Sequence, residues 1–428
     1  MKAPFMITSK FLWLVLQQLR KIWVRVVSFA ALAILTVVMA RFLSGFIPSK
    51  WTDQVGAQAV DQVLSILASS MLAVTTFSLS IAVSAFAAAA SSATPRATAL
   101  LQEDTTTQNV LATFLGAFLF SLLGIIALKA GYYDEPGLLV LFIATGAVLV
   151  FVVAALLRWI SHLMTFGRIE DTLNRVERAA SRSVKNRMDR PWMGGQPRVA
   201  PPRHDGVQIN ANEIGYVQYV DMKALSECAI ELEAQIQLLV LPGSFAHDTR
   251  PILSIEGATP NEEQTETLRN AISIGQQRSF DQDPRFGLIV LAEIASRALS
   301  PAVNDPGTAI DVIGRLVRVM SDWRSDAESE VIYPRVVVPS IKVSDLVEDG
   351  FRPIARDGAA LVEVQMRLQK GLTALKDLHP EGFSDPALEM SRYALERIDM
   401  VDLNDDERSV IRAVACYKET DKTEQARV

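Results

Sequence analysis

Hydrophobic residues are concentrated in the first two fifths of the chain. Four long apolar runs precede residue 165, and they predict helices at about 22–47, 62–95, 110–128 and 137–157. About 20 mostly apolar helical residues are needed to cross a hydrocarbon core of roughly 30 Å. The pattern therefore predicts an α-helical integral membrane domain with four transmembrane helices over residues 1–165.

The remainder of the chain alternates more finely between apolar and polar positions. A basic helical connector and a linker rich in proline and glycine occupy residues 166–204. Alternating runs at 215–220, 236–241 and 251–256 predict strands, which makes residues 205–260 a small α+β module. Residues 261–428 predict a mainly helical domain, where Asp-Pro pairs at 283–284, 305–306 and 385–386 indicate helix starts. The predicted fold is thus a transmembrane helical domain followed by a cytoplasmic α+β domain.

Charge separates the same two parts of the chain. The net charge of the 428 residues is −6, but residues 1–200 hold 18 Lys and Arg against 10 Asp and Glu, a balance of +8. The remaining 24 against 38 leave −14. Basic residues in the N-terminal tail and after the fourth run predict that both termini are cytoplasmic. The acidic total gives no support to nucleic-acid binding.

The second apolar run differs from the other three in length and composition. Residues 62–95 are uncharged over 34 positions and are rich in Ala, Ser and Thr. At 100° per residue, one stripe of hydroxyl and methyl groups lies within an arc of about 100°. Its members are Ser65, Ser69, Thr76, Ser80, Ser84, Ala87 and Ser91. Ser70, Thr75 and Ser78 fall outside this arc.

Two interpretations of the stripe are open. Small residues let membrane helices approach closely, and their hydroxyls can bond to carbonyls of the same helix. Alternatively, several copies of the helix surround an axis and the stripe lines a pore, with Phe77 and Phe86 as constrictions. Arg96 would then form a ring at the cytoplasmic mouth that favours anions, although it is equally an ordinary positive-inside anchor.

Beyond the membrane runs, polar side chains are densest between residues 274 and 315. A helix N-terminus can bind an anionic ligand, and the same residue types also cap helix turns at subunit interfaces. The candidate residues for a ligand-binding or interface loop are Arg278, Asp281, Asp283, Arg297, Ser300, Asn304 and Asp305.

Catalytic and metal-binding patterns are missing from the sequence. It contains no Gly-x-Gly-x-x-Gly, no Gly-x-x-x-x-Gly-Lys, no Cys-x-x-Cys and no Gly-x-Ser-x-Gly. Four histidines are scattered, and the only cysteines are Cys228 and Cys416. We therefore expect no enzyme activity, no metal and no cofactor. The middle of each apolar run holds no ionisable residue, which argues against a proton-coupled pump.

Several motifs resemble those of one bacterial family. They are Thr75-Thr-Phe-Ser-Leu-Ser-Ile81, Pro95-Arg96, Gly215-Tyr-Val-Gln-Tyr-Val-Asp221 and Arg297-Ala-Leu-Ser-Pro-Ala-Val-Asn-Asp-Pro306. Over nearly the whole chain the sequence resembles the bacterial "predicted membrane protein" family, domain of unknown function 2254. The resemblance implies a multi-pass topology in the bacterial inner membrane and no assigned activity. Two positions depart from the family pattern: Leu241 replaces an arginine before Pro-Gly, and Gly307 replaces an aromatic residue.

These observations lead to two hypotheses of function. The first is a homo-oligomeric inner-membrane ion channel or pore, lined by the second helix and assembled or regulated by the cytoplasmic domain. Its partners would be the lipid bilayer, further copies of the chain and inorganic ions. The alternative is a membrane-anchored ligand sensor or scaffold without transport activity.

Overall fold

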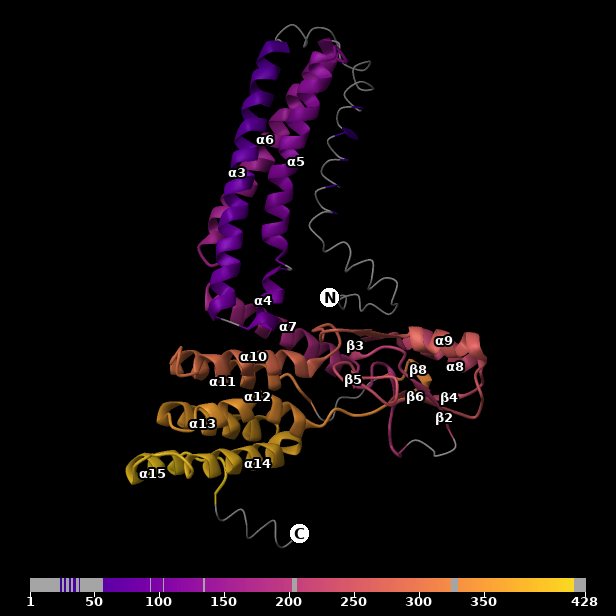
Figure 1. Ribbon diagram of the computed structural model, residues 1–428, viewed down its shortest axis with the longest axis vertical. Coiled ribbons are helices and arrows are strands. Elements are labelled where there is room, and N and C mark those ends of the chain that lie inside the picture. The colour runs from indigo at the N-terminus through magenta and orange to yellow at the C-terminus, as the bar shows by residue number, and fades with distance from the viewer. Residues whose placement is uncertain are drawn as a thin grey trace. The chain divides into compact units, whose positions relative to one another are not determined.

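The computed structural model describes two compact units, which are treated separately (Figure 1). It describes residues 57–92, 94–102, 104–133, 135–201, 206–324 and 330–418, together with six separate positions between 24 and 38. The N-terminal unit ends at Thr172, and Leu173 begins the C-terminal unit. The boundary lies inside helix α7 (Ile169–Asp189), so that one helix continues from the first unit into the second.

Three long helices build the N-terminal unit: α3 (Ala57–Ser92), α5 (Thr105–Lys129) and α6 (Glu135–Leu163). In the part of the chain that the structure describes, these three are long and apolar enough to cross a membrane. Four such helices were predicted. The first, at about 22–47, falls outside the described residues except for six isolated helical positions, so the structure supports three spans.

Helix α3 is continuous over 36 residues, a length of about 54 Å at 1.5 Å per residue. It packs against both α5 and α6 through a core that includes Leu67, Met71 and Phe114. The short helix α4 (Pro95–Gln102) follows, with a proline at its first position. Asp104 then caps α5 by accepting a hydrogen bond from the Thr107 amide.

Two sheets occupy one side of the C-terminal unit. The larger has the strand order β1-β8-β4-β6-β2, formed by β1 (Gly195–Pro197), β8 (Tyr333–Val338), β4 (Gln235–Leu238), β6 (Pro251–Glu256) and β2 (Val207–Asn210). β8 pairs in parallel with β1 and β4, and the other pairs are antiparallel. The smaller sheet is antiparallel, in the order β5 (Phe245–Ala246), β3 (Gly215–Val220) and β7 (Ile272–Gly275). Both sheets combine strands from before and after residue 260.

The apolar strand faces of the larger sheet form a core with two helices. These are α8 (Met222–Glu231), capped by Asp221, and α9 (Glu262–Asn270), which has a capping box at Asn261. Leu225 of α8 and Leu268 of α9 are fully buried in this core, together with Ile236 and Val336 of the strands. The strands predicted at 215–220 and 251–256 match β3 and β6.

The other side of the C-terminal unit consists of stacked helix pairs. α10 (Pro284–Ala298) and α11 (Pro306–Met320) form one layer, α12 (Val343–Asp357) and α13 (Val362–Leu378) the next, and α14 (Pro380–Ile398) and α15 (Asp405–Ala413) the last (Figure 1). Asp283 and Asp305 cap α10 and α11, as the Asp-Pro pairs predict.

The helix start predicted at Asp385-Pro386 is wrong, because α14 already begins at Pro380 and Pro386 lies inside it. A proline inside a helix normally costs about 3 kcal/mol. Here Phe383 and Ala387 on either side of it are fully buried, so packing against the neighbouring helices outweighs the local signal.

Candidate functional site

The polar stripe of α3 lies on the outer surface of the three-helix bundle. Among its members whose side chains are described, all are exposed: Ser65, Ser69, Thr76, Ser80, Ser84 and Ala87. The hydroxyl residues outside the predicted arc behave differently. Ser78 is fully buried, and Ser70 and Thr75 are half-buried. The helical periodicity therefore separates the outward-facing hydroxyls from the inward-facing ones.

The aromatic residues assigned to the pore lie on different sides of α3. Phe77 is 67% exposed, next to the stripe. Phe86 is half-buried, and its ring packs edge-on against Phe166 with the ring centroids 5.5 Å apart. Phe86 is therefore part of the bundle core. Arg96 is exposed on α4, whereas the side chain of Ser91 lies outside the described residues.

Three exposed hydroxyls of α3 bond to their own helix. Ser69, Thr76 and Ser84 donate to the carbonyl oxygens of Ser65, Leu72 and Ser80 at 3.0, 2.9 and 3.0 Å. Such bonds satisfy the hydroxyl proton without a partner helix. These three hydroxyls can consequently face lipid, another helix or water with their donors already paired.

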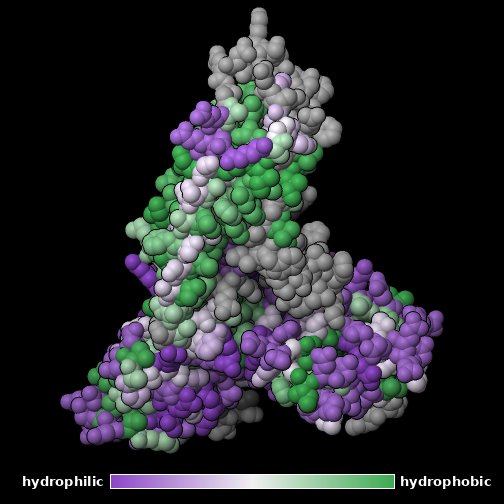
Figure 2. All heavy atoms as spheres, turned by 45° about the horizontal axis from the view of Figure 1, so that its top comes forward, coloured by the Kyte–Doolittle hydropathy of each residue, from purple (hydrophilic) through white to green (hydrophobic). Residues whose placement is uncertain are grey.

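The exposed face of α6 has a different chemistry. It carries large hydrocarbon side chains, among them Ile143, Val150, Phe151 and Leu157, with exposed fractions between 63% and 71%. Figure 2 shows the surface of the bundle as mainly hydrophobic, with a narrow pale strip of weakly polar residues. A lipid-facing surface favours residues such as those of α6. The exposed face of α3 is mixed: the Ser, Thr and Ala stripe is interleaved with large apolar side chains, among them Ile66 and Val83, which are 61% and 58% exposed.

An acid–histidine pair joins α5 and α6 at one end of the bundle. His162 Nε2 lies 2.9 Å from Asp104 Oδ2, and the Thr107 hydroxyl donates to the same oxygen at 2.6 Å. The rings of Trp159 and Phe166 lie on the His162 imidazole, with centroids 5.9 and 4.9 Å away. No local spacing in the sequence links the two residues, because Asp104 precedes His162 by 58 residues.

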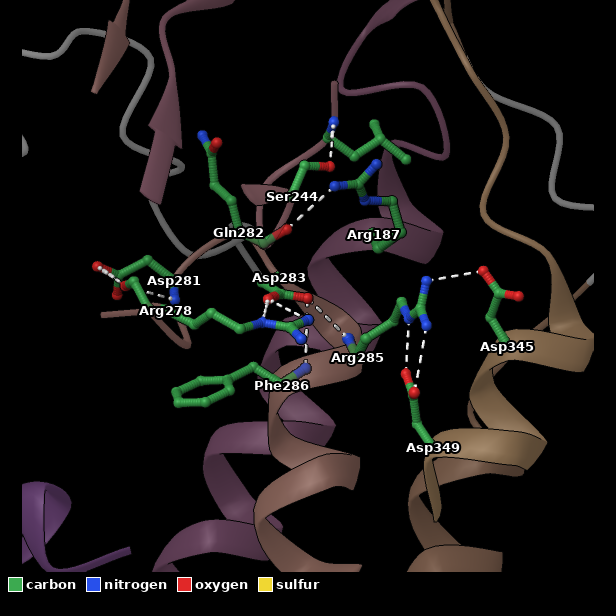
Figure 3. Close-up of polar contacts among 12 residues, drawn as sticks. Arg187, Ser244, Arg278, Asp281, Gln282, Asp283, Arg285, Phe286, Asp345 and Asp349 are labelled. Atoms are coloured by element: carbon green, nitrogen blue, oxygen red, sulfur yellow. Dashed lines mark hydrogen bonds and ion pairs between the residues drawn. The ribbon is translucent and has the colours of Figure 1, made fainter. Parts of the chain in front are cut away.

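A dense polar cluster lies at the start of α10 in the C-terminal unit (Figure 3). Asp283 is 1% exposed, and its carboxylate accepts from the backbone amides of Arg285 and Phe286. Arg278 forms an ion pair with Asp283 at 2.7 Å. Arg285 points the other way and binds Asp349 and Asp345 of α12 at 2.6 and 2.7 Å. The cluster thus connects the loop before α10 to the helix α12.

Arg187 and Gly243 complete this cluster, and the sequence assigned a role to neither. Arg187 of α7 is buried and donates to the Gln282 carbonyl at 3.0 Å. Burial lowers the pKa of Arg187 to about 10, against the opposing charge of Asp283. Burial also raises the pKa of Asp283 above its usual range, which Arg278 and the helix amides partly counter. Gly243 has φ +91°, and an added Cβ would lie 2.2 Å from Asp283 Oδ2.

The residues predicted as one ligand or interface loop divide between the two ends of α10. Arg278, Asp281 and Asp283 lie at its start. Arg297, Ser300, Asn304 and Asp305 lie at its other end, about 22 Å away for a 15-residue helix. Asn304 is exposed with φ +50°, and Asp305 binds the amide and hydroxyl of Thr308 at 3.1 and 2.6 Å. That second end is a capped turn.

The described residues hold no group of three or more His, Cys, Asp or Glu side chains placed to bind a metal ion. Cys228 and Cys416 are both buried, and neither forms a disulfide. Burial raises the pKa of the Cys228 thiol, with a smaller contribution from Glu231, so this thiol is a weak nucleophile.

Membrane-length helices followed by a large folded unit define the chain as an integral membrane protein. It belongs to the family described as "predicted membrane protein (DUF2254)", whose family model matches residues 20–374. The resemblance of the sequence motifs to this family is therefore confirmed.

Curated relatives come from mycobacteria. The uncharacterized protein Mb1321c of Mycobacterium bovis and the uncharacterized protein Rv1290c of Mycobacterium tuberculosis are each 30% identical over 255 residues. The match covers 54% of this chain and 47% of each relative. The chain thus spans about half the length of the curated relatives it matches. No solved structure matches the chain.

Proposed function

We propose that this membrane protein is a homo-oligomeric ion channel or pore of the bacterial inner membrane. The exposed polar stripe of α3 lines the pathway, and the C-terminal unit assembles or regulates the ring from the cytoplasm, where both chain termini lie. The chain is not an enzyme. The observation that carries the proposal is the outward position of every described hydroxyl of the stripe, on a helix long enough to cross the bilayer.

The physical argument rests on the contrast between two exposed faces of one bundle. Hydrocarbon tails solvate the Ile, Val, Phe and Leu side chains of α6 well. Hydroxyl groups bonded to their own helix gain little from lipid but offer acceptor oxygens to a passing ion or water molecule. Such weak, repeated sites suit conduction, because an ion must both enter and leave them. Copies of the chain meeting along α3 would bring these oxygens around one axis.

Arg96 supports a preference for anions. It is exposed on α4, directly after the stripe helix. One arginine per subunit at a pore mouth would raise the local concentration of anions and repel cations. Replacing Arg96 with glutamine should reduce the ratio of chloride to potassium permeability of reconstituted protein.

Cysteine accessibility tests the lining directly, since both native cysteines are buried. We would place single cysteines at Ser69, Thr76 and Ser80 of α3, and at the matched exposed positions Val150 and Leu157 of α6. A charged, membrane-impermeant thiol reagent is applied to the full chain in liposomes while conductance is recorded. Modification of the α3 cysteines should be fast and should change the current. The α6 cysteines should stay unmodified, because lipid surrounds them.

Two outcomes would reject the channel. One is equal inertness of the α3 and α6 cysteines together with no conductance at any voltage or tension. The other is a monomer in native mass spectrometry of the reconstituted chain. Either result would leave the membrane-anchored sensor or scaffold, which needs no pathway along α3.

A further inference from the structure

We propose that the basic face of α7 is a docking surface for anionic lipid headgroups. This basic face consists of Arg175, Arg178, Arg182 and Lys185, which fall within an arc of about 80° at 100° per residue. Arg178, Arg182 and Lys185 are exposed, and Arg175 is half-buried. The proposal stands whether or not the α3 stripe conducts ions.

The opposite face of α7 packs against the rest of the C-terminal unit. Leu173, Val176, Ala180 and Val184 are at most 2% exposed. Gly287 of α10 approaches so closely that an added Cβ would lie 2.4 Å from the Ala180 Cβ. The apolar stripe of this amphipathic helix is therefore covered by protein and is not available for insertion between lipid tails.

Ion pairs also fix the rotation of α7. Glu177 binds Arg315 and Arg318 of α11 at 2.6 and 2.7 Å. The acidic residue in the middle of α7 thus faces its own unit. Asp171 and Asp189 lie within the same arc as the four cations, so the basic face has a net charge of +2. Arg178 donates to the Asn174 carbonyl at 3.0 Å, which orients its guanidinium along the helix surface. Lys185 Nζ lies 3.5 Å from Asp322 Oδ2, and the Lys185 side chain is still 62% exposed.

The chain connection brings this basic face within reach of headgroups. Helix α6, the last candidate span, ends at Leu163, and α7 begins at Ile169. Five residues therefore separate the two helices. Clusters of four or more Lys and Arg immediately after a membrane helix attract acidic lipids, with a contribution of about fivefold in affinity for each cation. The occupant that fits this chemistry and position is the anionic headgroup layer of the same bilayer.

Because the apolar face is covered, the contact must be electrostatic. Binding should therefore depend on the fraction of anionic lipid and weaken as salt screens the charges over a Debye length of about 10 Å at 0.1 M. An inserted amphipathic helix would respond instead to lipid packing and much less to salt.

The test uses the full chain in a neutral detergent, titrated with dioleoyl phosphatidylglycerol or with the zwitterionic phosphatidylcholine and followed by native mass spectrometry. The triple variant R178Q/R182Q/K185Q is compared with R335Q/R367Q/K370Q, which removes the same charge from exposed positions on β8 and α13. The first variant should bind phosphatidylglycerol about 100-fold more weakly. The control variant should bind as the unmodified chain does, and neither change should affect phosphatidylcholine binding.

The proposal is overturned if the α7 variant keeps its affinity within about fivefold, or if the control variant loses as much. It also fails if millimolar inorganic phosphate displaces the lipid, which would indicate a phosphate site, or if an oligonucleotide binds the same cations without a lipid preference. A measurement on the unmodified chain needs no variant to fold: phosphatidylglycerol binding should weaken when NaCl rises from 50 to 500 mM. Binding that ignores salt would reject the electrostatic contact.

Discussion

At the scale of single residues, the turn at Gly243 packs directly against the polar cluster of α10. Its φ of +91° already disfavours any side chain, and the Asp283 carboxylate occupies the space that a Cβ would need. Gly257 has a similar φ of +101°, but the nearest atom to its added Cβ is 3.9 Å away. The two glycines thus differ in crowding and share a backbone conformation that would strain any residue with a side chain.

We expect Gly243→Ala to lower the free energy of unfolding by about 3 kcal/mol and Gly257→Ala by about 1 kcal/mol. The shared part is the left-handed backbone, and the difference is the overlap with Asp283. Urea unfolding of the full chain in neutral detergent measures both. In an Asp283→Ala background the cost of Gly243→Ala should fall toward that of Gly257→Ala. If Gly243→Ala and Gly257→Ala were equally destabilising in the otherwise unmodified chain, overlap with Asp283 would not be the cause.

Sequence analysis predicted the residues whose role is local. Asp283 and Asp305 cap helices that begin at the next residue, as the Asp-Pro pairs indicate. The role of Arg187 could not be predicted from sequence, because its partner, the Gln282 carbonyl, lies 95 residues later in the chain. The amphipathic pattern of α7 placed Arg187 among ordinary connector cations. A Pro-Gly turn after a strand was the one signal that pointed to Gly243.

At the scale of elements, α7 is attached to the helix stack by a close crossing and by an ion-pair bridge. The crossing at Gly287 leaves no room for a methyl group, whereas an added Cβ at Gly314 of α11 would meet only the arginine side-chain ends of Arg367 and Arg318 at 3.5 and 3.7 Å. Both glycines lie within helices, where alanine is intrinsically better by about 1 kcal/mol. Replacing each glycine with alanine should therefore change the stability of the chain in opposite directions.

Gly287→Ala should destabilise the chain by about 2 kcal/mol, because α7 and α10 must separate. Gly314→Ala should stabilise it by about 0.5 to 1 kcal/mol through helix propensity. Thermal unfolding in neutral detergent, with hydrogen exchange of α7 as a local readout, distinguishes the two. A stabilising Gly287→Ala would mean that the crossing is looser than the structure has it.

The Glu177 bridge gives the stability of the C-terminal unit a pH dependence. Burial alone would raise the pKa of Glu177, but Arg318 and Arg315 lower it below its ordinary value of 4.5. A carboxylate with a lowered folded pKa stabilises the fold above its unfolded pKa and loses that contribution as pH falls through the folded value. Glu177→Gln should cost about 2 kcal/mol at pH 7. The difference in stability between this variant and the unmodified chain should shrink below pH 4.5. A difference that stays constant with pH would show that the ionised Glu177 carboxylate is not its cause.

The position of an element was predictable from sequence where a local signal alone determines it and no long-range packing opposes that signal. Membrane helices α3, α5 and α6 follow from apolar length, since the bilayer sets a minimum that few other structures reach. Strand pairing was not predictable, because β8 joins β4 about 100 residues earlier and no local pattern encodes the partner. The start of α14 failed for a related reason: burial around Phe383 decides it, and Asp385-Pro386 only resembles a start.

At the scale of the whole molecule, the proposed channel requires contact between copies of the chain along the α3 stripe. On an insertion scale, a leucine at the centre of a membrane helix is favourable by about 0.3 to 0.6 kcal/mol. If the α3 stripe faced lipid in a monomer, replacing its serines with leucine would leave the chain intact or more stable. If the stripe meets other α3 helices, the same change forces closely packed backbones apart.

We therefore expect Ser80→Leu combined with Ser84→Leu to shift the reconstituted chain from oligomer to monomer, with at least a tenfold rise in the dissociation constant. Val150→Leu on α6, at a position that is 68% exposed, should leave the oligomer unchanged. Counting subunits by single-molecule photobleaching in liposomes measures both. An oligomer that survives the double substitution would place the subunit contacts elsewhere and remove the α3 pathway with them, whereas loss of both oligomer and conductance would tie the two properties to this one surface.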